Sequence, residues 1–201
     1  MELRYEGDRA PILAAIQEAL EQARTSDTGG ISSQGDDSPR ADSEPPTPPF
    51  RIVIDGPSGS GKSTLAQELA SDLGAIVVNS DEWVGGWEGL LASRPLTEDL
   101  LTGRRADYPR WNWETSEYDG TVTIDPNLPW IVEGCGTLTP ATADAATLSL
   151  WVETDPAEAK ARGLARDGGV YAPFWDVWNA QEREHWRLHD PRTLADIRIS
   201  T

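Results

Sequence analysis

The stretch GPSGSGKS, residues 56–63, decides the fold. It follows the apolar run FRIVID (50–55), which is typical of a buried strand, and it runs into KSTLAQELASDL (62–73), which is typical of a helix. The stretch matches G-x-x-x-x-G-K-[ST] in full, in the strand-to-helix context that a phosphate-binding loop requires. Glycines let backbone N–H groups converge on phosphate oxygens, and the helix N-terminus adds a partial positive charge. The sequence therefore predicts a nucleoside triphosphate site.

Two side chains of this loop have specific expected roles. Lys62 is one of only two lysines among the 17 basic residues. A compact ammonium fits against the β- and γ-phosphates, whereas a planar guanidinium would overfill the loop. The hydroxyl of Ser63 is expected to bind Mg²⁺. The residues expected to contact ATP are Gly56, Ser58, Gly59, Ser60, Gly61, Lys62, Ser63 and Thr64.

Beyond the loop, apolar runs alternate with amphipathic stretches in the βα manner. The further strands are expected at 75–79, 130–134, 147–153 and 195–200, and the further helices at 155–167 and 174–188. Continuous apolar runs fit a parallel sheet that is buried on both faces. The expected fold class is α/β: a P-loop NTPase, with a parallel β-sheet sandwiched by helices. Ligands are expected beyond the carboxyl ends of the strands.

The chain before the loop contains two segments of different composition. Residues 11–23 carry Ile12, Ile16 and Leu20 at four-residue spacing, which predicts one amphipathic helix. Residues 25–49 are dominated by Gly, Ser, Asp and Pro, and they cannot bury enough apolar surface to offset their ordering entropy. The expected organisation is an N-terminal helical extension (1–24), a disordered linker (25–49) and a P-loop kinase domain (50–201). A docking motif is the alternative for the linker.

Composition restricts the partners. A formal charge of -17 and a pI near 4.4 argue against nucleic acid and anionic membranes, because a polyanion would be repelled over most of the surface. The first residues are charged, and no apolar run approaches the roughly 20 residues of a membrane span. The single Cys135 fits a reducing compartment. We expect a cytoplasmic protein that acts on a small-molecule acceptor, with its oligomeric state left open.

The phosphate loop alone leaves three classes of protein: GTP switches, ATP-driven motors and small kinases. The chain contains no Asn-Lys-x-Asp guanine reader and is short for a motor, which favours a kinase. A kinase needs a base near the attacked hydroxyl, and Asp81, directly after the strand at 75–79, is the candidate. Helix capping is its alternative role. Glu133 ends the strand at 130–134 and suits a Mg²⁺-bound water or an acceptor hydroxyl.

Two arginines are placed to act as a lid. Arg162 and Arg166 lie four residues apart, so they share one face of the helix expected at 155–167. On that face they can meet the phosphates of a nucleotide in the loop. The alternative is a solvated helix face with Glu158 as an ion-pair partner.

The Trp-rich insert before residue 128 holds candidate acceptor ligands. Flat rings can stack on a base or a sugar face. Of the tryptophans at 83, 87, 111 and 113, packing against the sheet is preferred for at least two. The expected acceptor-site residues are Asp81, Trp83, Arg110, Trp111 and Glu133, with Arg110 as the cation.

Several other reactive or aromatic side chains are expected to be structural. Asp55 is expected to hydrogen-bond the loop. Trp175 and Trp178 have helical spacing, which favours core packing. His185 and His189 lie four apart, a spacing that can bind metal, but no Cys or third His accompanies them.

Six segments of the chain resemble the uridine kinase-like P-loop kinases, especially divergent actinobacterial members. They are IDGPSGSGKSTLA (54–66), NSDEW (79–83), YPRWNWETSEY (108–118), IVEG (131–134), LWVETDPAEAKARGLARD (150–167) and ADIRIST (195–201). The resemblance implies a nucleoside/nucleotide kinase-like fold. It also implies that the loop binds ATP through Lys62 and Ser63, that Asp81 is the base toward a nucleoside 5′-hydroxyl, and that Arg162 and Arg166 meet the phosphates. Where uridine kinases proper carry an aromatic pair after the Asp, this chain has Glu82-Trp83.

The expected function is that of an ATP- and Mg²⁺-dependent small-molecule kinase. It would transfer the γ-phosphoryl group of ATP to a hydroxyl of a nucleoside (uridine- or cytidine-like) or a similar small acceptor. Two alternatives stay open. One is a kinase for a nucleotide, a sugar or an antibiotic, and the other is a non-catalytic regulatory module that binds ATP.

Overall fold

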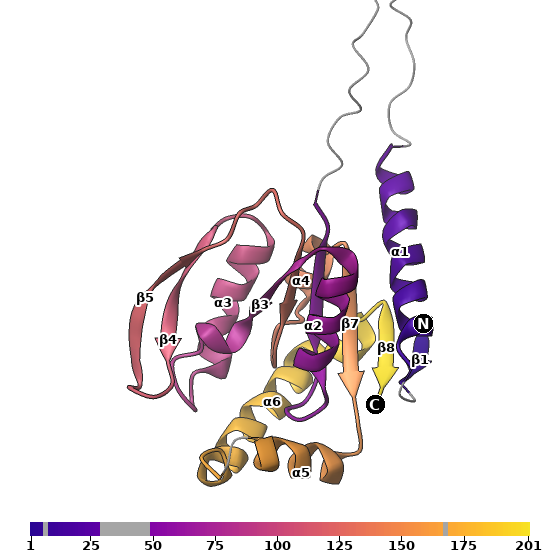
Figure 1. Cartoon of the computed structure of the whole chain (residues 1–201). Helices are drawn as coiled ribbons and strands as arrows, with labels where there is room; N and C mark the ends of the chain where they lie inside the picture. The colour runs from indigo at the N-terminus through magenta and orange to yellow at the C-terminus, as the bar shows by residue number, and fades with distance from the viewer. Residues whose placement is uncertain (6–7, 29–48, 167–168) are drawn as a thin grey trace, which may run out of the picture.

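One parallel sheet forms the centre of the protein. The computed structural model describes residues 1–5, 8–28, 49–166 and 169–201, and the sheet runs in the order β1-β8-β7-β2-β6-β3. All neighbouring strands in it are parallel. Its strands are β1 (Glu2–Arg4), β2 (Arg51–Asp55), β3 (Ile76–Asn79), β6 (Trp130–Glu133), β7 (Leu148–Glu153) and β8 (Ile197–Ser200). The expected α/β fold class is confirmed (Figure 1).

Helices pack on both faces of this sheet. They are α1 (Ala10–Thr28), α2 (Lys62–Leu73), α3 (Leu90–Leu101), α4 (Pro140–Ala145), α5 (Pro156–Arg166), α6 (Trp175–His189) and α7 (Pro191–Leu194). Two 3-10 turns, η1 (Ser80–Glu82) and η2 (Ala172–Phe174), precede the Trp-rich insert and α6. The expected helix at 62–73 matches α2 at both ends, and those at 155–167 and 174–188 match α5 and α6 within one residue.

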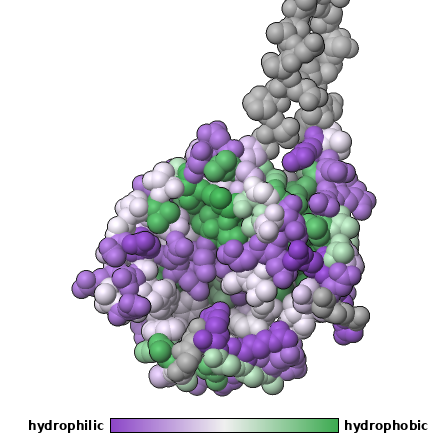
Figure 2. Space-filling view, in the orientation of Figure 1, coloured by the Kyte–Doolittle hydropathy of each residue, from purple (hydrophilic) through white to green (hydrophobic). Residues whose placement is uncertain are grey.

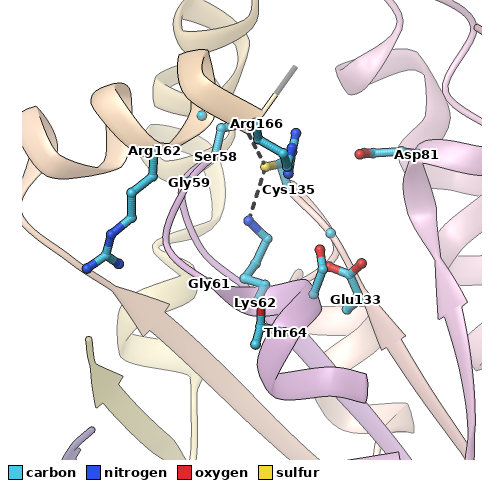
Figure 3. Close-up of a pocket in the computed structure, with 13 residues that line it drawn as sticks. Ser58, Gly59, Gly61, Lys62, Thr64, Asp81, Glu133, Cys135, Arg162 and Arg166 are labelled. Carbon is cyan, nitrogen blue, oxygen red and sulfur yellow. Dashed lines mark hydrogen bonds between the residues drawn. The ribbon is translucent and has the colours of Figure 1, made fainter. Parts of the chain in front are cut away.

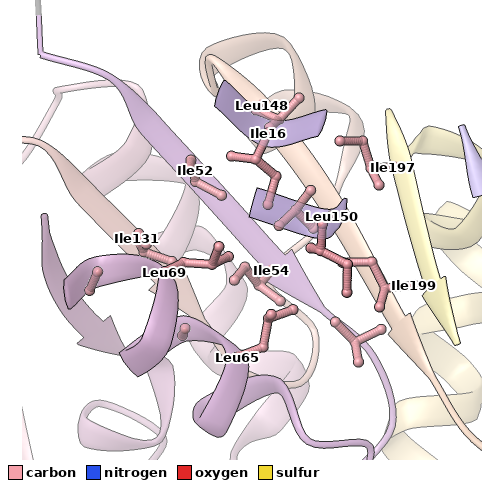
Figure 4. Packing of buried hydrophobic residues seen from close by; sticks show 14 of the residues in the cluster. Ile16, Ile52, Ile54, Leu65, Leu69, Ile131, Leu148, Leu150, Ile197 and Ile199 are labelled. Atoms are coloured by element: carbon pink, nitrogen blue, oxygen red, sulfur yellow. The ribbon is translucent and has the colours of Figure 1, made fainter. Parts of the chain in front are cut away.

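Side chains on one face of the sheet form the larger core. Ile52 and Ile54 point to this face because alternate residues of a strand share a side. They meet Leu65 and Leu69 of α2 and Ile16 of α1, as Figure 4 shows. The cluster holds α1 and α2 on the same face, so the start of α2, where the phosphate loop ends, is anchored by buried apolar contacts.

The N-terminal segment is part of this core. Strand β1 pairs with β8 at the edge of the sheet, and Ile12, Ile16 and Leu20 are buried against it. The structure therefore integrates the segment expected as an extension into the sheet domain. Helix α1 also continues to Thr28, so the expected linker start at 25 is corrected; residues 29–48 of the linker lie outside the described residues.

The opposite face carries the Trp-rich insert. It contains α3 and a two-stranded antiparallel hairpin, β4 (Asp107–Asn112) with β5 (Glu117–Thr123), which lies away from β1 in Figure 1. Val53 and Val132 of the sheet pack with Leu100 of α3 and with Tyr108 of β4. The sequence analysis predicted no helix or strand in this insert. Its side chains supply much of the second hydrophobic core, on this face of the sheet.

Polar side chains cover most of the surface in the view of Figure 2, with smaller hydrophobic patches among them. Within the described part of the chain, no helix has both the length and the apolar character needed to span a membrane.

The role of α1 can be tested by truncating a buried side chain. Ile16 is fully buried, so Ile16→Ala should lower the free energy of unfolding by about 2–5 kcal/mol through a lost apolar contact and a cavity. Gln17→Ala, on the exposed side of the same helix, should change it by about 0.5 kcal/mol or less. Urea denaturation followed by circular dichroism measures both. Equal, small effects would show that α1 is not part of the cooperative core.

Candidate active site

The phosphate loop connects β2 to α2 at the carboxyl edge of the sheet. Helix α2 begins at Lys62, and Gly61 precedes it with φ 91°, a left-handed conformation that favours glycine. The N-terminal N–H groups of α2 are thereby left facing the loop, where they can bind an anion. The loop thus has the local geometry that its sequence predicts.

A buried carboxylate, that of Asp55, fixes the base of the loop. It accepts hydrogen bonds from the backbone N–H groups of Gly56 (2.6 Å), Gly136 (3.0 Å) and Leu138 (2.9 Å). Its other contact is His185 Nε2 of α6, at 3.0 Å. The expected structural hydrogen bond from Asp55 to the loop is confirmed, and His185 serves the same network.

A second buried carboxylate, Glu182 of α6, holds the tip of the loop. Glu182 Oε1 accepts a hydrogen bond from the backbone N–H of Ser58 at 2.7 Å, and Asn179 donates to its other oxygen at 3.0 Å. The hydroxyl of Tyr171 lies 3.0 Å from Ser58 Oγ. Sequence reasoning missed both contacts, because their partners lie more than 110 residues from the loop.

Lys62 points along the inside of the loop. Its ammonium donates to the carbonyl of Pro57 at 2.9 Å and lies 3.4 Å from Cys135 Sγ. Burial opposes its charge, but the nearby carboxyl groups of Glu133, Glu182 and Asp55 help to hold the pKa of Lys62 above its ordinary value. The lysine is therefore charged before any phosphate arrives.

Cys135 faces the same space. It is buried, yet it lines the cavity beside the loop. Burial raises the pKa of the Cys135 thiol well above its ordinary value, and Lys62 opposes that shift only in part. The thiol therefore stays protonated and acts as a small polar neighbour of the lysine.

Ser63 and Glu133 offer oxygen ligands at the start of α2. Their side chains are hydrogen-bonded, and burial raises the pKa of Glu133, with Lys62 opposing and Asp81 reinforcing the shift. A hydroxyl and one carboxylate fit Mg²⁺, which completes its shell with phosphate oxygens and water. Among the described residues no group of three or more His, Cys, Asp and Glu side chains forms a fuller metal cage.

A cavity of about 260 Å³ lies over the loop. In Figure 3, Lys62 and Arg166 point into it, whereas the guanidinium of Arg162 points away from Lys62. Arg162 pairs with Glu158, the alternative partner weighed from the sequence, and donates to Thr201 Oγ1 at 3.3 Å, while its side chain still borders the cavity. The residues that line this phosphate cavity are Ser58, Gly59, Gly61, Lys62, Ser63, Thr64, Asp81, Glu133, Gly134, Cys135, Arg162, Gly163 and Arg166.

Helix α5 lies directly against the loop. A Cβ atom at Gly59, whose φ is +80°, would stand 2.0 Å from the carbonyl oxygen of Ala159 in α5. Gly163 on the same helix is also within 3.1 Å of that position. The contact puts α5, the helix that carries Arg162 and Arg166, beside the phosphate cavity.

An aromatic cavity of about 380 Å³ adjoins the phosphate cavity. Trp87, Trp113, Tyr171 and Trp178 line it, and Trp87 stacks on Tyr171 with a centroid distance of 5.1 Å and an interplanar angle of 16°. The two cavities share the residues Ser58, Asp81 and Arg166. They are therefore neighbours, with the carboxylate of Asp81 at their junction.

Three expected acceptor residues line neither cavity. Trp83 is 1 % exposed, packs on Tyr108 and donates from Nε1 to Thr97 at 3.2 Å. Arg110 pairs with Asp119 on the hairpin surface. Trp111 packs edge-on against Tyr118, with a ring distance of 4.9 Å.

Other aromatic residues line the cavity in their place. Trp87 and Trp113 belong to the expected insert, but nothing in the sequence separates them from Trp83 and Trp111. Trp178 is buried, as expected from its spacing, and also faces the cavity. Tyr171 showed no sequence signal at all.

The contact between α5 and the loop gives a test. Gly59→Ala should lower ATP affinity about tenfold or more, because the new methyl group would push α5 or the loop out of place. Gly103→Ala is the matched control: its φ is +73°, so the backbone strain is similar, but a Cβ there meets no atom within 4 Å. Isothermal titration with Mg²⁺-ATP measures both, and equal affinities in the two variants would contradict the close contact.

Comparison with known protein families gives a match over the region that contains the phosphate loop. Residues 52–116 match a family model described as an AAA domain. A tRNA dimethylallyltransferase of Azorhizobium caulinodans is 30% identical over 44% of this chain and 32% of its own length. A second, from Ruegeria sp. (strain TM1040), is 31% identical over 75% of this chain and 62% of its own length. The chain thus spans less than two thirds of either relative.

Solved structures match over more of the chain. A possible uridine kinase from Bacillus stearothermophilus superposes with a TM-score of 0.51 at 16% identity, covering 92% of this chain and 99% of that one. A candidate fructose transport system kinase from Silicibacter sp. TM1040 gives 0.53 at 20% identity, covering 92% and 98%. Together with the phosphate loop and the parallel sheet, these likenesses show that the chain shares the P-loop kinase fold of these two structures.

Proposed function

We propose that this protein is an ATP- and Mg²⁺-dependent kinase that phosphorylates a hydroxyl group of a small acceptor, a nucleoside being the first candidate. One observation carries the proposal: the Asp81 carboxylate borders both the phosphate cavity and the aromatic cavity. A base at that junction stands between the place for the γ-phosphate and the place for an acceptor.

The side chains around the junction divide the work of transfer. Lys62 and the loop N–H groups hold the phosphates, and Arg166 offsets charge on the moving phosphoryl group. Asp81 accepts the proton of the acceptor hydroxyl. At the same time the hydroxyl oxygen bonds to the γ-phosphorus, and the bond between that phosphorus and the ADP oxygen breaks. Mg²⁺ held by Ser63 and Glu133 would neutralise phosphate charge. Catalysis then rests mainly on positioning and electrostatics.

The aromatic cavity supports an acceptor with a flat or apolar face. Stacking on an aromatic side chain is worth about 1–3 kcal/mol per base, and Trp87 and Trp113 offer such rings beside Asp81. A nucleoside meets both requirements, because it has a planar base and a primary hydroxyl. A sugar, a nucleotide or an antibiotic with an apolar face is the alternative acceptor.

Transfer of a dimethylallyl group to tRNA is the second candidate, and the two related sequences support it. The formal charge of -17 opposes it, because tRNA is a polyanion. Incubation with tRNA and labelled dimethylallyl diphosphate, the form that a phosphate loop would hold, separates the candidates. Label in the tRNA would favour the second, and acceptor-dependent ADP release from ATP would favour the first.

Asp81 is the residue to change first. Asp81→Asn should slow phosphoryl transfer by about 10²–10⁴-fold, because an amide cannot take the hydroxyl proton, and should leave ATP affinity nearly unchanged. ADP release is measured with Mg²⁺-ATP against nucleosides, nucleoside monophosphates, sugars and aminoglycosides, with Lys62→Ala as the blank. That blank should lose ATP affinity as well as transfer.

Glu82→Gln is the matched control for this assay. Glu82 is the neighbouring carboxylate, but it accepts the hydroxyl of Tyr108 at 2.5 Å and borders neither cavity. Full acceptor-dependent activity in Asp81→Asn would remove Asp81 from the role of base. ATP binding without release for any acceptor would favour the regulatory module.

The aromatic cavity gives an independent prediction. Trp113→Ala should raise the KM for the acceptor about tenfold or more while leaving the KM for ATP unchanged, because one stacking surface is lost. Trp111→Ala, two residues away on the same hairpin and outside the cavity lining, should leave both KM values near those of the unaltered protein. An unchanged acceptor KM in Trp113→Ala would place the acceptor elsewhere.

A further inference from the structure

A third cavity, of about 370 Å³, lies on the other side of the phosphate cavity. The two share Gly61, Thr64 and Arg162, which are not among the residues that the phosphate cavity shares with the aromatic one. The three cavities therefore form a row with the phosphate loop in the middle. The third is lined by Tyr5, Gly61, Thr64, Leu65, Glu68, Arg162, Ile199 and Thr201.

The outer wall of this cavity comes from the N-terminal segment. Tyr5 follows β1, and its backbone N–H donates to the carbonyl of Ser200 at 2.8 Å. Thr201 in turn donates from its hydroxyl to the carbonyl of Ser60 in the phosphate loop at 3.0 Å. The tyrosine is thus tied through β8 to the loop itself, and its position is set by the sheet.

The chemistry of the third cavity suits an uncharged, partly flat group. Tyr5, Leu65 and Ile199 supply apolar surface, and the planar guanidinium of Arg162 stands at the boundary with the phosphate cavity. Planar guanidinium groups and aromatic rings both stack on flat heterocycles. Asp81 does not border this cavity, so an acceptor hydroxyl bound here would lie away from the base.

We propose that the N-terminal strand completes the nucleotide site, with Tyr5 as part of the contact surface for the base of the donor triphosphate in the third cavity. The inference rests on the proposed function, since it assumes that the loop holds the triphosphate of that nucleotide. It assigns the donor to one end of the row of cavities and the acceptor to the other. The N-terminal strand is then a component of the nucleotide site.

Binding measurements on the full chain test this assignment without any acceptor. Tyr5→Ala should lower the affinity for Mg²⁺-ATP and Mg²⁺-ADP about tenfold or more. Inorganic tripolyphosphate, which has no base, should bind to this variant as it does to the unaltered protein. Tyr5→Phe keeps the ring and should retain nucleotide affinity. Tyr118→Ala removes a tyrosine that is 54 % exposed on the hairpin, and it should change the affinity for neither ligand. Thermal melting of each variant confirms that it is folded.

The failures of the two proposals differ. If the unaltered chain does not bind Mg²⁺-ATP, the proposed function fails, and the third cavity loses its assignment with it. If the unaltered chain binds ATP, Lys62→Ala abolishes binding and Tyr5→Ala leaves it unchanged, only the assignment of the third cavity is overturned. Equal weakening of nucleotide and tripolyphosphate in Tyr5→Ala would also overturn it, since Tyr5 would then act by supporting the loop.

Discussion

The candidate site depends on one buried carboxylate, that of Asp55. A charge with no exposed surface is costly unless it is fully hydrogen-bonded, and three backbone N–H groups with His185 meet that requirement. The donors come from the phosphate loop, from the segment after β6 and from α6. One carboxylate therefore fixes three chain segments relative to one another, and the residues beside them, Lys62 and Cys135, take their places from it.

Helix α6 contacts both the phosphate loop and the aromatic cavity. Trp178, Glu182 and His185 are spaced four and three residues apart, so they lie on one face of the helix. That face contributes to the aromatic cavity through Trp178, holds the N–H of Ser58 through Glu182 and reaches Asp55 through His185. A displacement of α6 would alter the loop and the acceptor side together.

The sequence predicts the features that depend on local pattern. The loop motif locates β2 and α2. The helix expected at 155–167 is α5, and at its start the carboxylate of Asp155 accepts hydrogen bonds from the N–H groups of Ala157 and Glu158. The sequence does not say which other element packs against the apolar side of each helix or strand. The stripe at Ile16 predicts a buried side of α1 without saying that it packs on the sheet. The hairpin β4–β5 is mostly exposed on β5 and has no alternating apolar signal. Nothing local separates Trp113, which faces the cavity, from Trp111, which does not.

The charges around the loop explain why a divalent cation belongs in the proposal. Lys62, Arg162 and Arg166 border the phosphate cavity, and so do the carboxylates of Asp81 and Glu133. These carboxylates would repel a triphosphate, which carries several negative charges of its own, and the -17 charge of the whole chain adds to that repulsion. Burial raises the pKa of Glu133, because its charge is poorly solvated there. Ser63 and Glu133 would hold a Mg²⁺ ion, and its positive charge would offset the repulsion between carboxylate and phosphate. Asp81 would then be the carboxylate of this cavity that takes the proton of the acceptor hydroxyl in the proposed reaction.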